Sequence, residues 1–204
     1  NEQDRVFSDA TTEYGVREGF WGWGVELFDF ENDGDLDGVM TNGWRATENF
    51  EDPMVAWVND GSGEAWIEGA EELGFDDVYQ GRGLYTLDFD RDGDLDVLVA
   101  RHGQEPLLYR NNVVTSDHWT RIKVIGTTSN VDAIGARVTV TTEEFSRLYE
   151  VGASAHYSGH GERDVFVGLG DAESFDVTVT FPVSGETVTL EDQSADQLVV
   201  IEEP

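Results

Sequence analysis

Hydrophobic residues alternate with polar ones in short runs along the N-terminal half of the chain, and the runs are separated by Gly, Asn and Asp residues. Period-two alternation of this length is typical of half-buried β-strands joined by tight turns. The runs recur in units of about 59 residues, each with about four short strands. In the first unit, the expected strands run from Val25 to Phe30, Gly38 to Thr41, Val55 to Val58 and Ala65 to Ile67.

The C-terminal half shows the same alternation without a helical signal, and its runs suit a β-sandwich. These runs are Arg121 to Ile125, Arg137 to Thr141, Val165 to Val167, Phe175 to Phe181, Thr187 to Leu190 and Leu198 to Ile201. The polar segment 111–117 marks a boundary, so we expect domains at 1–112 and 113–204. Because the linker is short, the two domains should touch. The pattern therefore predicts an all-β protein, with blade-like repeats followed by a sandwich-like domain.

Two acidic nonapeptides stand 59 positions apart: Asp29-Phe-Glu-Asn-Asp-Gly-Asp-Leu-Asp37 and Asp88-Phe-Asp-Arg-Asp-Gly-Asp-Leu-Asp96. Ca2+ takes six to eight oxygen ligands at roughly 2.3 to 2.6 Å, so a binding loop must fold back on itself. Side chains at positions 1, 3, 5 and 9 can converge on one ion, while position 7 offers its carbonyl. Gly34 and Gly93, at position 6, permit the sharp turn. The predicted metal residues are Asp29, Glu31, Asp33, Asp35, Asp37, Asp88, Asp90, Asp92, Asp94 and Asp96.

Repulsion among five carboxylates in nine residues implies that each folded loop holds a cation, and an all-oxygen ligand set favours Ca2+. An EF-hand is excluded because its position 12 needs Glu, whereas here that position is Met40 or Val99. The alternative, a merely solvated acidic turn, suits one copy better than two matched copies. We therefore expect two Ca2+ sites on loops that join strands.

The loops resemble the FG-GAP/VCBS repeat, the calcium-bearing blade unit of integrin-α-type β-propellers. Gly22-Trp-Gly24 before the first loop, Gly81-Arg-Gly83 before the second and Leu107-Leu-Tyr-Arg-Asn-Asn112 after it are similar to that pattern. Glu31 departs from the usual Asp or Asn. The segment Phe7 to Val16 resembles the strand that ends a preceding blade.

A second resemblance covers the C-terminal half. Trp119-Thr-Arg-Ile-Lys-Val124, Ser129-Asn-Val-Asp-Ala-Ile-Gly-Ala-Arg-Val138, Val167-Gly-Leu-Gly170 and Phe181-Pro-Val-Ser-Gly185 are similar to the ASPIC/UnbV domain, which commonly follows such repeats. Val131 stands where that family usually has a basic residue, and Phe181 where it often has Trp.

A closed propeller needs about four to eight blades, and this chain offers two plus an opening strand. Unfinished blades leave open sheet edges. Either the chain is a fragment, or the repeats pack on the C-terminal domain, or other subunits complete them.

The chain is extremely acidic: 43 Asp and Glu against 12 Lys and Arg give a formal net charge of −31. An acidic surface with a single Lys, Lys123, is what we expect of a halophilic protein, in which concentrated salt screens self-repulsion. A generically acidic secreted protein is the alternative. Nucleic acid is excluded as a partner, because its phosphates would be repelled.

An extracellular or cell-surface location is expected, because simple calcium loops suit millimolar extracellular calcium. The chain starts at Asn1 without Met, so a signal peptide is taken to have been removed. No long apolar run predicts membrane insertion, and the absence of Cys leaves the redox compartment open.

Catalytic candidates are weak. His156 and His160 would share a face only on a helix, and their surroundings indicate a loop. The tryptophans of the first repeat suit packing between blades better than binding of a glycan or partner. We expect a non-enzymatic, calcium-binding adhesion or assembly module, possible partners being copies of itself in a filament, another cell-surface protein or a glycan. The alternative is an accessory or ligand-binding domain of a larger secreted enzyme.

Overall fold

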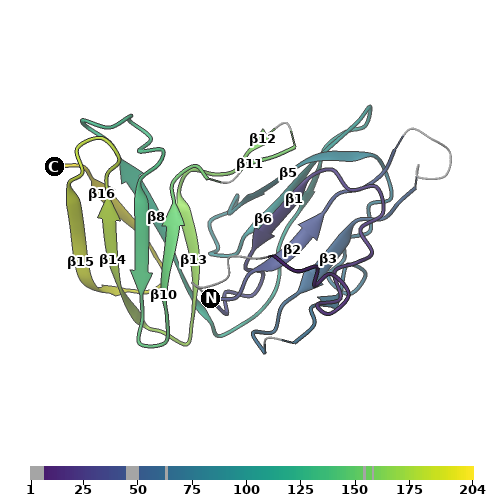
Figure 1. The fold of residues 1–204 in the computed structure, drawn as a ribbon, viewed down its shortest axis with the longest axis horizontal. Coiled ribbons are helices and arrows are strands. Elements are labelled where there is room, and N and C mark those ends of the chain that lie inside the picture. The colour runs from purple at the N-terminus through teal and green to yellow at the C-terminus, as the bar shows by residue number, and fades with distance from the viewer. Residues whose placement is uncertain (1–6, 45–50, 63, 154, 158) are drawn as a thin grey trace.

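The computed structural model describes residues 7–44, 51–62, 64–153, 155–157 and 159–204. Every regular element among them is a β-strand, so the predicted all-β class is confirmed. The strands form two groups that lie side by side (Figure 1), with the repeats in one group and the C-terminal strands in the other. In the described part of the chain, no helix is long and apolar enough to cross a membrane.

The first repeat forms a four-stranded antiparallel sheet in the order β1-β2-β3-β4. Its strands are β1 (Val25–Phe28), β2 (Asp37–Met40), β3 (Val55–Val58) and β4 (Ile67–Glu68). The acidic loop joins β1 to β2, as predicted, and pairs Phe28 with Asp37 at its base. The central strands β2 and β3 are almost wholly buried, and the continuous apolar sequence of β3 fits this position.

The second repeat has three strands, one fewer than the pattern predicted. They are β5 (Gly81–Leu87), β6 (Asp96–Arg101) and β7 (Leu107–Tyr109), in the order β5-β6-β7. The second acidic loop joins β5 to β6. No fourth strand follows because the chain leaves β7 through residues 110–117 and enters the C-terminal group at β8.

The prediction of an opening strand at residues 7–16 is wrong. Within residues 7–16 the chain turns at 11–15, where the Val16 amide donates to the Thr11 carbonyl at 3.1 Å. Gly15 has a φ of 72°, which breaks an extended path. One hydrogen bond, from the Trp66 amide to the Tyr14 carbonyl at 3.1 Å, links this turn to the chain just before β4.

The C-terminal group contains a four-stranded sheet, β10-β9-β14-β15, and a three-stranded sheet, β13-β8-β16. Their strands are β8 (His118–Ile125), β9 (Arg137–Thr141), β10 (Ser146–Glu150), β13 (Val165–Gly170), β14 (Ser174–Thr180), β15 (Thr187–Ser194) and β16 (Gln197–Glu202). β16 runs parallel to β8, and the remaining pairs are antiparallel. All six expected strands are present, whereas β10 was not expected.

A small hairpin of β11 (Ala155–His156) and β12 (Gly159–His160) was also not expected. It extends from the C-terminal group toward β5 (Figure 1). His156 and His160 therefore lie on two short strands, where the sequence predicted a loop.

Each half has its own hydrophobic core. The C-terminal core lies between the two sheets and is built from β-branched and aromatic side chains, among them Ile122, Val138, Val140, Val167, Val177, Val179 and Phe181. The core of the repeats joins both N-terminal sheets and contains Phe28, Phe30, Val39, Met54, Ala56, Phe75, Leu84, Leu95, Val97 and Val99. Phe166 of β13 packs against this second core, so the halves are in contact, as the short linker predicted.

The Gly-x-Gly motifs allow the two repeats to approach closely. A Cβ on Gly24 would lie 2.6 Å from the Arg82 carbonyl oxygen, and one on Gly81 would lie 2.5 Å from Thr41 Cβ. Only glycine fits at such distances. The Arg82 guanidinium lies over the Trp23 ring at 4.3 Å, which adds a cation–π contact between the repeats.

Candidate metal centre

The two acidic loops have left-handed residues at the same two positions. At position 4, Asn32 and Arg91 both have a φ of 65°, and at position 6, Gly34 and Gly93 have φ values of 92° and 98°. The left-handed region is unfavourable for most residues, so two such residues at matched positions are a specific feature. The loops therefore repeat in structure as well as in sequence.

Each loop brings three carboxylates together. In the first loop, one oxygen each of Asp29, Glu31 and Asp37 lies within 4.8 Å of the others, and Asp88, Asp90 and Asp96 form the same group in the second. Two ligands at about 2.4 Å from one ion can be at most about 4.8 Å apart, so the spacing suits a shared Ca2+. Positions 1, 3 and 9 thus converge as the sequence predicted.

The carboxylates at position 9 are held in the same way in both loops. Asp37 accepts the Phe30 amide at 2.9 Å and the Asn59 amide at 2.8 Å. Asp96 accepts the Phe89 amide at 3.0 Å and the Asn111 amide at 2.9 Å. Because backbone amides hold both oxygens of each carboxylate, these side chains cannot rotate away from the loop.

Sequence reasoning did not include Asn59 and Asn111 in the site. Asn59 directly follows β3, and Asn111 lies one residue further from the end of β7. Both strands are the second one after the acidic loop, and this shared position was the available signal. Their side chains also brace the loops: Asn59 Nδ2 donates to the Leu36 carbonyl at 3.3 Å, and Asn111 Nδ2 to the Phe30 carbonyl at 2.8 Å.

Two buried oxygens point to a missing electrostatic partner. Glu31 Oε2 and Asp88 Oδ1 are both shielded from solvent and have no hydrogen-bond partner. A buried carboxylate oxygen without a donor is costly, and a cation would relieve that cost. Carboxylate oxygens alone make up the ligand groups, which is the chemistry that Ca2+ prefers. The residues present therefore fit the ion, and Glu31 fits despite its departure from the usual Asp.

The predicted side chains at positions 5 and 7 lie outside the two groups. Asp33 and Asp92 accept the amide two residues ahead, at 2.8 and 3.2 Å, and so shape the turn. Asp35 forms an ion pair with Arg147 at 3.3 Å, and Asp94 accepts a hydrogen bond from Asn32 at 2.9 Å. Position 7 was expected to offer its carbonyl, so an engaged side chain there is compatible with the prediction.

Burial raises the pKa of most of these carboxyl groups. Desolvation raises the pKa of Asp29 to about 7 and that of Asp37 to about 8, although backbone hydrogen bonds oppose the change. The pKa values of Glu31, Asp88 and Asp96 are raised for the same reason, with neighbouring carboxylates adding to the effect. The ion-free loops thus hold negative charge at an energetic cost that a cation would offset.

Arg110 partly compensates the second loop. Its guanidinium contacts Asp90 at 2.8 Å and Asp92 at 3.0 Å, while its side chain is 52% exposed. One of its partners belongs to the ligand group and the other shapes the turn. An ion in this loop would therefore compete with Arg110 for Asp90.

Residues of the C-terminal half pack against both acidic loops. The Gly170 amide donates to the Asn32 carbonyl at 2.9 Å, and Gly168 of the same strand lies against Asp29. At the second loop, the Trp119 indole covers Gly93, and it stacks on Phe166 with 5.6 Å between ring centroids. These contacts were not predicted, since no local pattern indicates which residue of a distant strand meets a loop.

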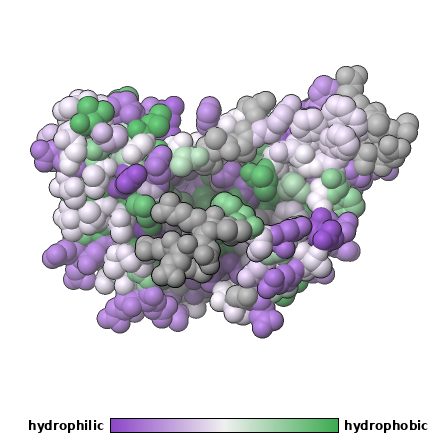
Figure 2. Space-filling model, in the orientation of Figure 1, coloured by the Kyte–Doolittle hydropathy of each residue, from purple (hydrophilic) through white to green (hydrophobic). Residues whose placement is uncertain are grey.

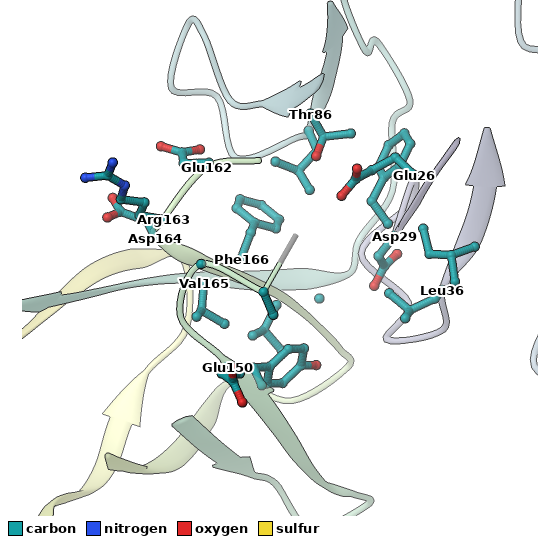
Figure 3. Close-up of a pocket in the computed structure, with 18 of the residues that line it drawn as sticks. Glu26, Asp29, Leu36, Thr86, Glu150, Glu162, Arg163, Asp164, Val165 and Phe166 are labelled. Atoms are coloured by element: carbon teal, nitrogen blue, oxygen red, sulfur yellow. The ribbon is translucent and has the colours of Figure 1, made fainter. Parts of the chain in front are cut away.

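A cleft of about 250 Å3 lies between the halves, beside the first loop. Figure 3 shows Glu26, Asp29 and Leu36 on the side of the repeats, facing Glu162, Val165 and Phe166 from the C-terminal half. Figure 2 shows a mostly hydrophilic surface on this face, with some hydrophobic residues near the middle, where the two groups of strands meet. Arg163, which also lines the cleft, forms an ion pair with Asp132.

Comparison with known families identifies the C-terminal region. Residues 126–204 match the family described as ASPIC and UnbV, as the sequence resemblance indicated. No curated protein matches the chain. The matched region begins after both acidic loops, but it contains Arg147, Gly168 and Gly170, which contact the first loop.

The structure explains the segment Ser129 to Val138, which carried part of the resemblance to the ASPIC/UnbV domain. Glu203, which is 2% exposed, accepts the backbone amides of residues 127–129 at 2.7 to 2.8 Å and hydrogen bonds from the Ser129 and Ser184 hydroxyls. Ala133 is fully buried with a φ of 48°, and Asn130 bonds both backbone groups of Ile134. These residues fix a loop to the C-terminal strand, so their roles are structural.

Proposed function

We propose that the chain is a non-enzymatic calcium-binding module for adhesion or assembly at the cell surface, with FG-GAP/VCBS-type repeats at residues 1–112. The observation that carries this proposal is the matched pair of three-carboxylate groups on loops that share left-handed residues at positions 4 and 6. Asp29, Glu31 and Asp37 would hold one Ca2+, and Asp88, Asp90 and Asp96 the other. The loop carbonyls at Asp35 and Asp94 remain the proposed additional ligands.

In this proposal the ion has an electrostatic and mechanical role. It would neutralise buried carboxylates and join the two strands that flank each loop, β1 with β2 and β5 with β6. Both loops lie at the junction with the C-terminal half, so bound ions would stiffen the whole molecule. No proton transfer or covalent step is required of these residues.

Open sheet edges support assembly between copies. β4 and β7 each end a sheet, and Ile67 on β4 is 61% exposed. These strands are two and three residues long, so an added strand would pair over a short stretch. A neighbouring chain could add a strand at such an edge. A repeated head-to-tail contact that does not close into a ring would give a filament.

The direct test measures calcium stoichiometry and particle mass on the same sample. Isothermal titration should give two ions per chain, with one lost in Asp37→Asn and one in Asp96→Asn. Light scattering should then show large assemblies with calcium that dissociate in excess chelator. Absence of calcium binding would overturn the proposal, whereas a calcium-bound monomer would restrict it to a module that binds another partner.

The cleft between the halves supports a second candidate, an accessory or ligand-binding domain of a larger secreted enzyme. Its apolar floor includes Val165 and Phe166, and acidic side chains surround it. Exposed aromatic rings, such as Trp21 stacked on Trp44 at 5.5 Å, offer a further surface for a glycan. Binding of soluble oligosaccharides to the calcium-loaded monomer, lost in Trp21→Ala, would favour this candidate.

A further inference from the structure

Asn32 links the two acidic loops directly. Its side-chain amide donates to the Gly93 carbonyl at 3.2 Å and to Asp94 Oδ1 at 2.9 Å. The residue is 2% exposed, so these hydrogen bonds are shielded from water. Its own carbonyl accepts the Gly170 amide at 2.9 Å, which ties the same residue to the C-terminal half.

The repeated sequence of the two loops does not account for this link. Arg91 occupies the same position in the second loop with the same φ of 65°, yet its side chain is exposed at the surface. The two residues therefore share a backbone conformation and differ in what the side chain reaches. This asymmetry makes Arg91 a matched internal control for Asn32.

The contacts of Asn32 lie where each loop must be ordered to hold an ion. Asn32 stands between Glu31 and Asp33 in the first loop, and it reaches the turn glycine and position 7 of the second. An ion that orders the first loop would fix Asn32, and Asn32 would then hold Gly93 and Asp94 in place. Binding of an ion at the second loop would then cost less conformational entropy, because part of that loop is already ordered.

Repulsion between two bound ions would oppose this coupling. The loops carry ten acidic side chains, which exceed the four positive charges of two Ca2+ ions. Net charge in this region would thus stay negative with both ions present, and attraction of the second ion would persist. We therefore expect the hydrogen bonds of Asn32 to outweigh the repulsion between the ions, so that the coupling is positive.

We propose that the two acidic loops bind calcium with positive cooperativity and that Asn32 is the positioning residue that couples them. This inference rests on the proposed calcium function. The link comprises two hydrogen bonds, so its loss should change the coupling by about two- to tenfold in affinity. By linkage, the effect must be equal in both directions.

The test is a thermodynamic cycle with calcium as the only titrant. Calcium affinity of the second loop is measured by isothermal titration with the first loop intact and with it disabled by Asp29→Asn. The pair of measurements is repeated in Asn32→Gly and in Arg91→Gly, both of which permit the left-handed φ. Circular dichroism of each ion-free variant checks that it is folded, and Asn32→Asp replaces Asn32→Gly if the latter does not fold.

We expect disabling the first loop to weaken the second about two- to tenfold in the native background and in Arg91→Gly. In Asn32→Gly the weakening should be clearly smaller, although Asn111, which bonds Phe30 of the first loop and Asp96 of the second, still links them. Equal coupling in Asn32→Gly and Arg91→Gly would overturn the role of Asn32. Two ions that bind independently in the native protein would overturn the cooperativity while leaving the proposed function intact. If the native protein binds no calcium, both the cooperativity and the proposed function are overturned.

Discussion

Gly168 and Asp29 are 139 positions apart in the chain and in direct contact in the fold: a Cβ on Gly168 would lie 2.0 Å from Asp29 Oδ2. The glycine belongs to β13 of the C-terminal half, and the carboxylate belongs to the first acidic loop. The same Asp29 oxygen accepts the Gly34 amide at 2.8 Å, so it cannot move without disturbing the turn. The geometry of the first candidate metal site thus depends on a residue outside the repeats.

Gly168→Ala is expected to weaken calcium binding at the first loop more than at the second, which would change only through the coupling between the loops. The added methyl group would displace Asp29 from the group it forms with Glu31 and Asp37. A tenfold loss corresponds to about 1.4 kcal/mol, which is within the cost of such overpacking. Isothermal titration would measure it, with Gly83→Ala as the control because its new Cβ would meet only ordinary contacts, at 3.5 Å or more. Equal weakening at both loops would contradict this prediction.

Asp96→Asn is expected to destabilise the ion-free protein by about 1–3 kcal/mol, because a single amide oxygen cannot accept both backbone amides. Asp96 is fully buried and accepts the amides of Phe89 and Asn111. Asp92→Asn is the control and should cost less than about 1 kcal/mol, since its ion pair with Arg110 is partly exposed. Urea denaturation in chelator measures both, and a control as destabilised as Asp96→Asn would refute the difference in role.

Arg110→Gln is expected to raise calcium affinity at the second loop by about two- to fivefold. The guanidinium repels the cation and holds Asp90, which belongs to the ligand group. Exposed ion pairs are weak because solvent screens them, so the effect should be small. Titration should show a smaller change at the first loop, transmitted only through the coupling between the loops. Lower affinity in the variant would mean that Arg110 supports the site and does not compete with the ion.

Calcium affinity at the first loop is expected to rise with pH through the range of about 7 to 8. Burial raises the pKa of Asp29 to about 7 and that of Asp37 to about 8, so the ion must displace protons below these values. For the ion-free protein the sign is reversed: protonated carboxyls favour the fold, and this contribution diminishes as pH rises from the unfolded pKa of 3.8 through the folded values. Titration in buffers of different ionisation enthalpy would count the released protons. An affinity independent of pH would contradict the prediction.

The ion-free protein should become more stable as salt rises, because a net charge of −31 opposes the compact state. At about 0.1 M salt the Debye length is about 10 Å, and at about 1 M it is about 3 Å, so neighbouring carboxylates are screened only at the higher value. Melting temperature measured in sodium chloride across this range, with chelator present, tests the halophilic interpretation. A melting temperature that does not depend on salt would rule it out.

Local pattern was sufficient for much of the fold. Alternation located the strands of the first sheet within a few residues, and the spacing of Asp29 and Asp37 placed a loop between β1 and β2. It failed at residues 7–16, where Gly15 with a positive φ turns the chain. It also missed β10, a strand whose residues are half-buried or exposed and therefore give a weak hydrophobic signal.

The ligand groups were predictable because their residues are close in sequence. The surroundings of the groups were not, because they depend on tertiary contacts. Nothing in the local sequence indicates that Trp119 covers Gly93 or that Asn32 reaches Asp94. The sequence also suggested equal roles for positions 1, 3, 5 and 9, whereas Asp33 and Asp92 shape the turn by accepting the amides of Asp35 and Asp94.

The fit of Trp119 against Gly93 limits how this architecture can be recombined in evolution. A Cβ on Gly93 would lie 2.0 Å from Trp119 Nε1, so the indole and the loop are complementary in shape. A gene fusion that joined these repeats to a different C-terminal domain would replace the indole with an unrelated surface and expose the loop to solvent. We therefore expect the repeats and the C-terminal domain to be inherited as a unit, with changes on one side of the contact selected together with changes on the other.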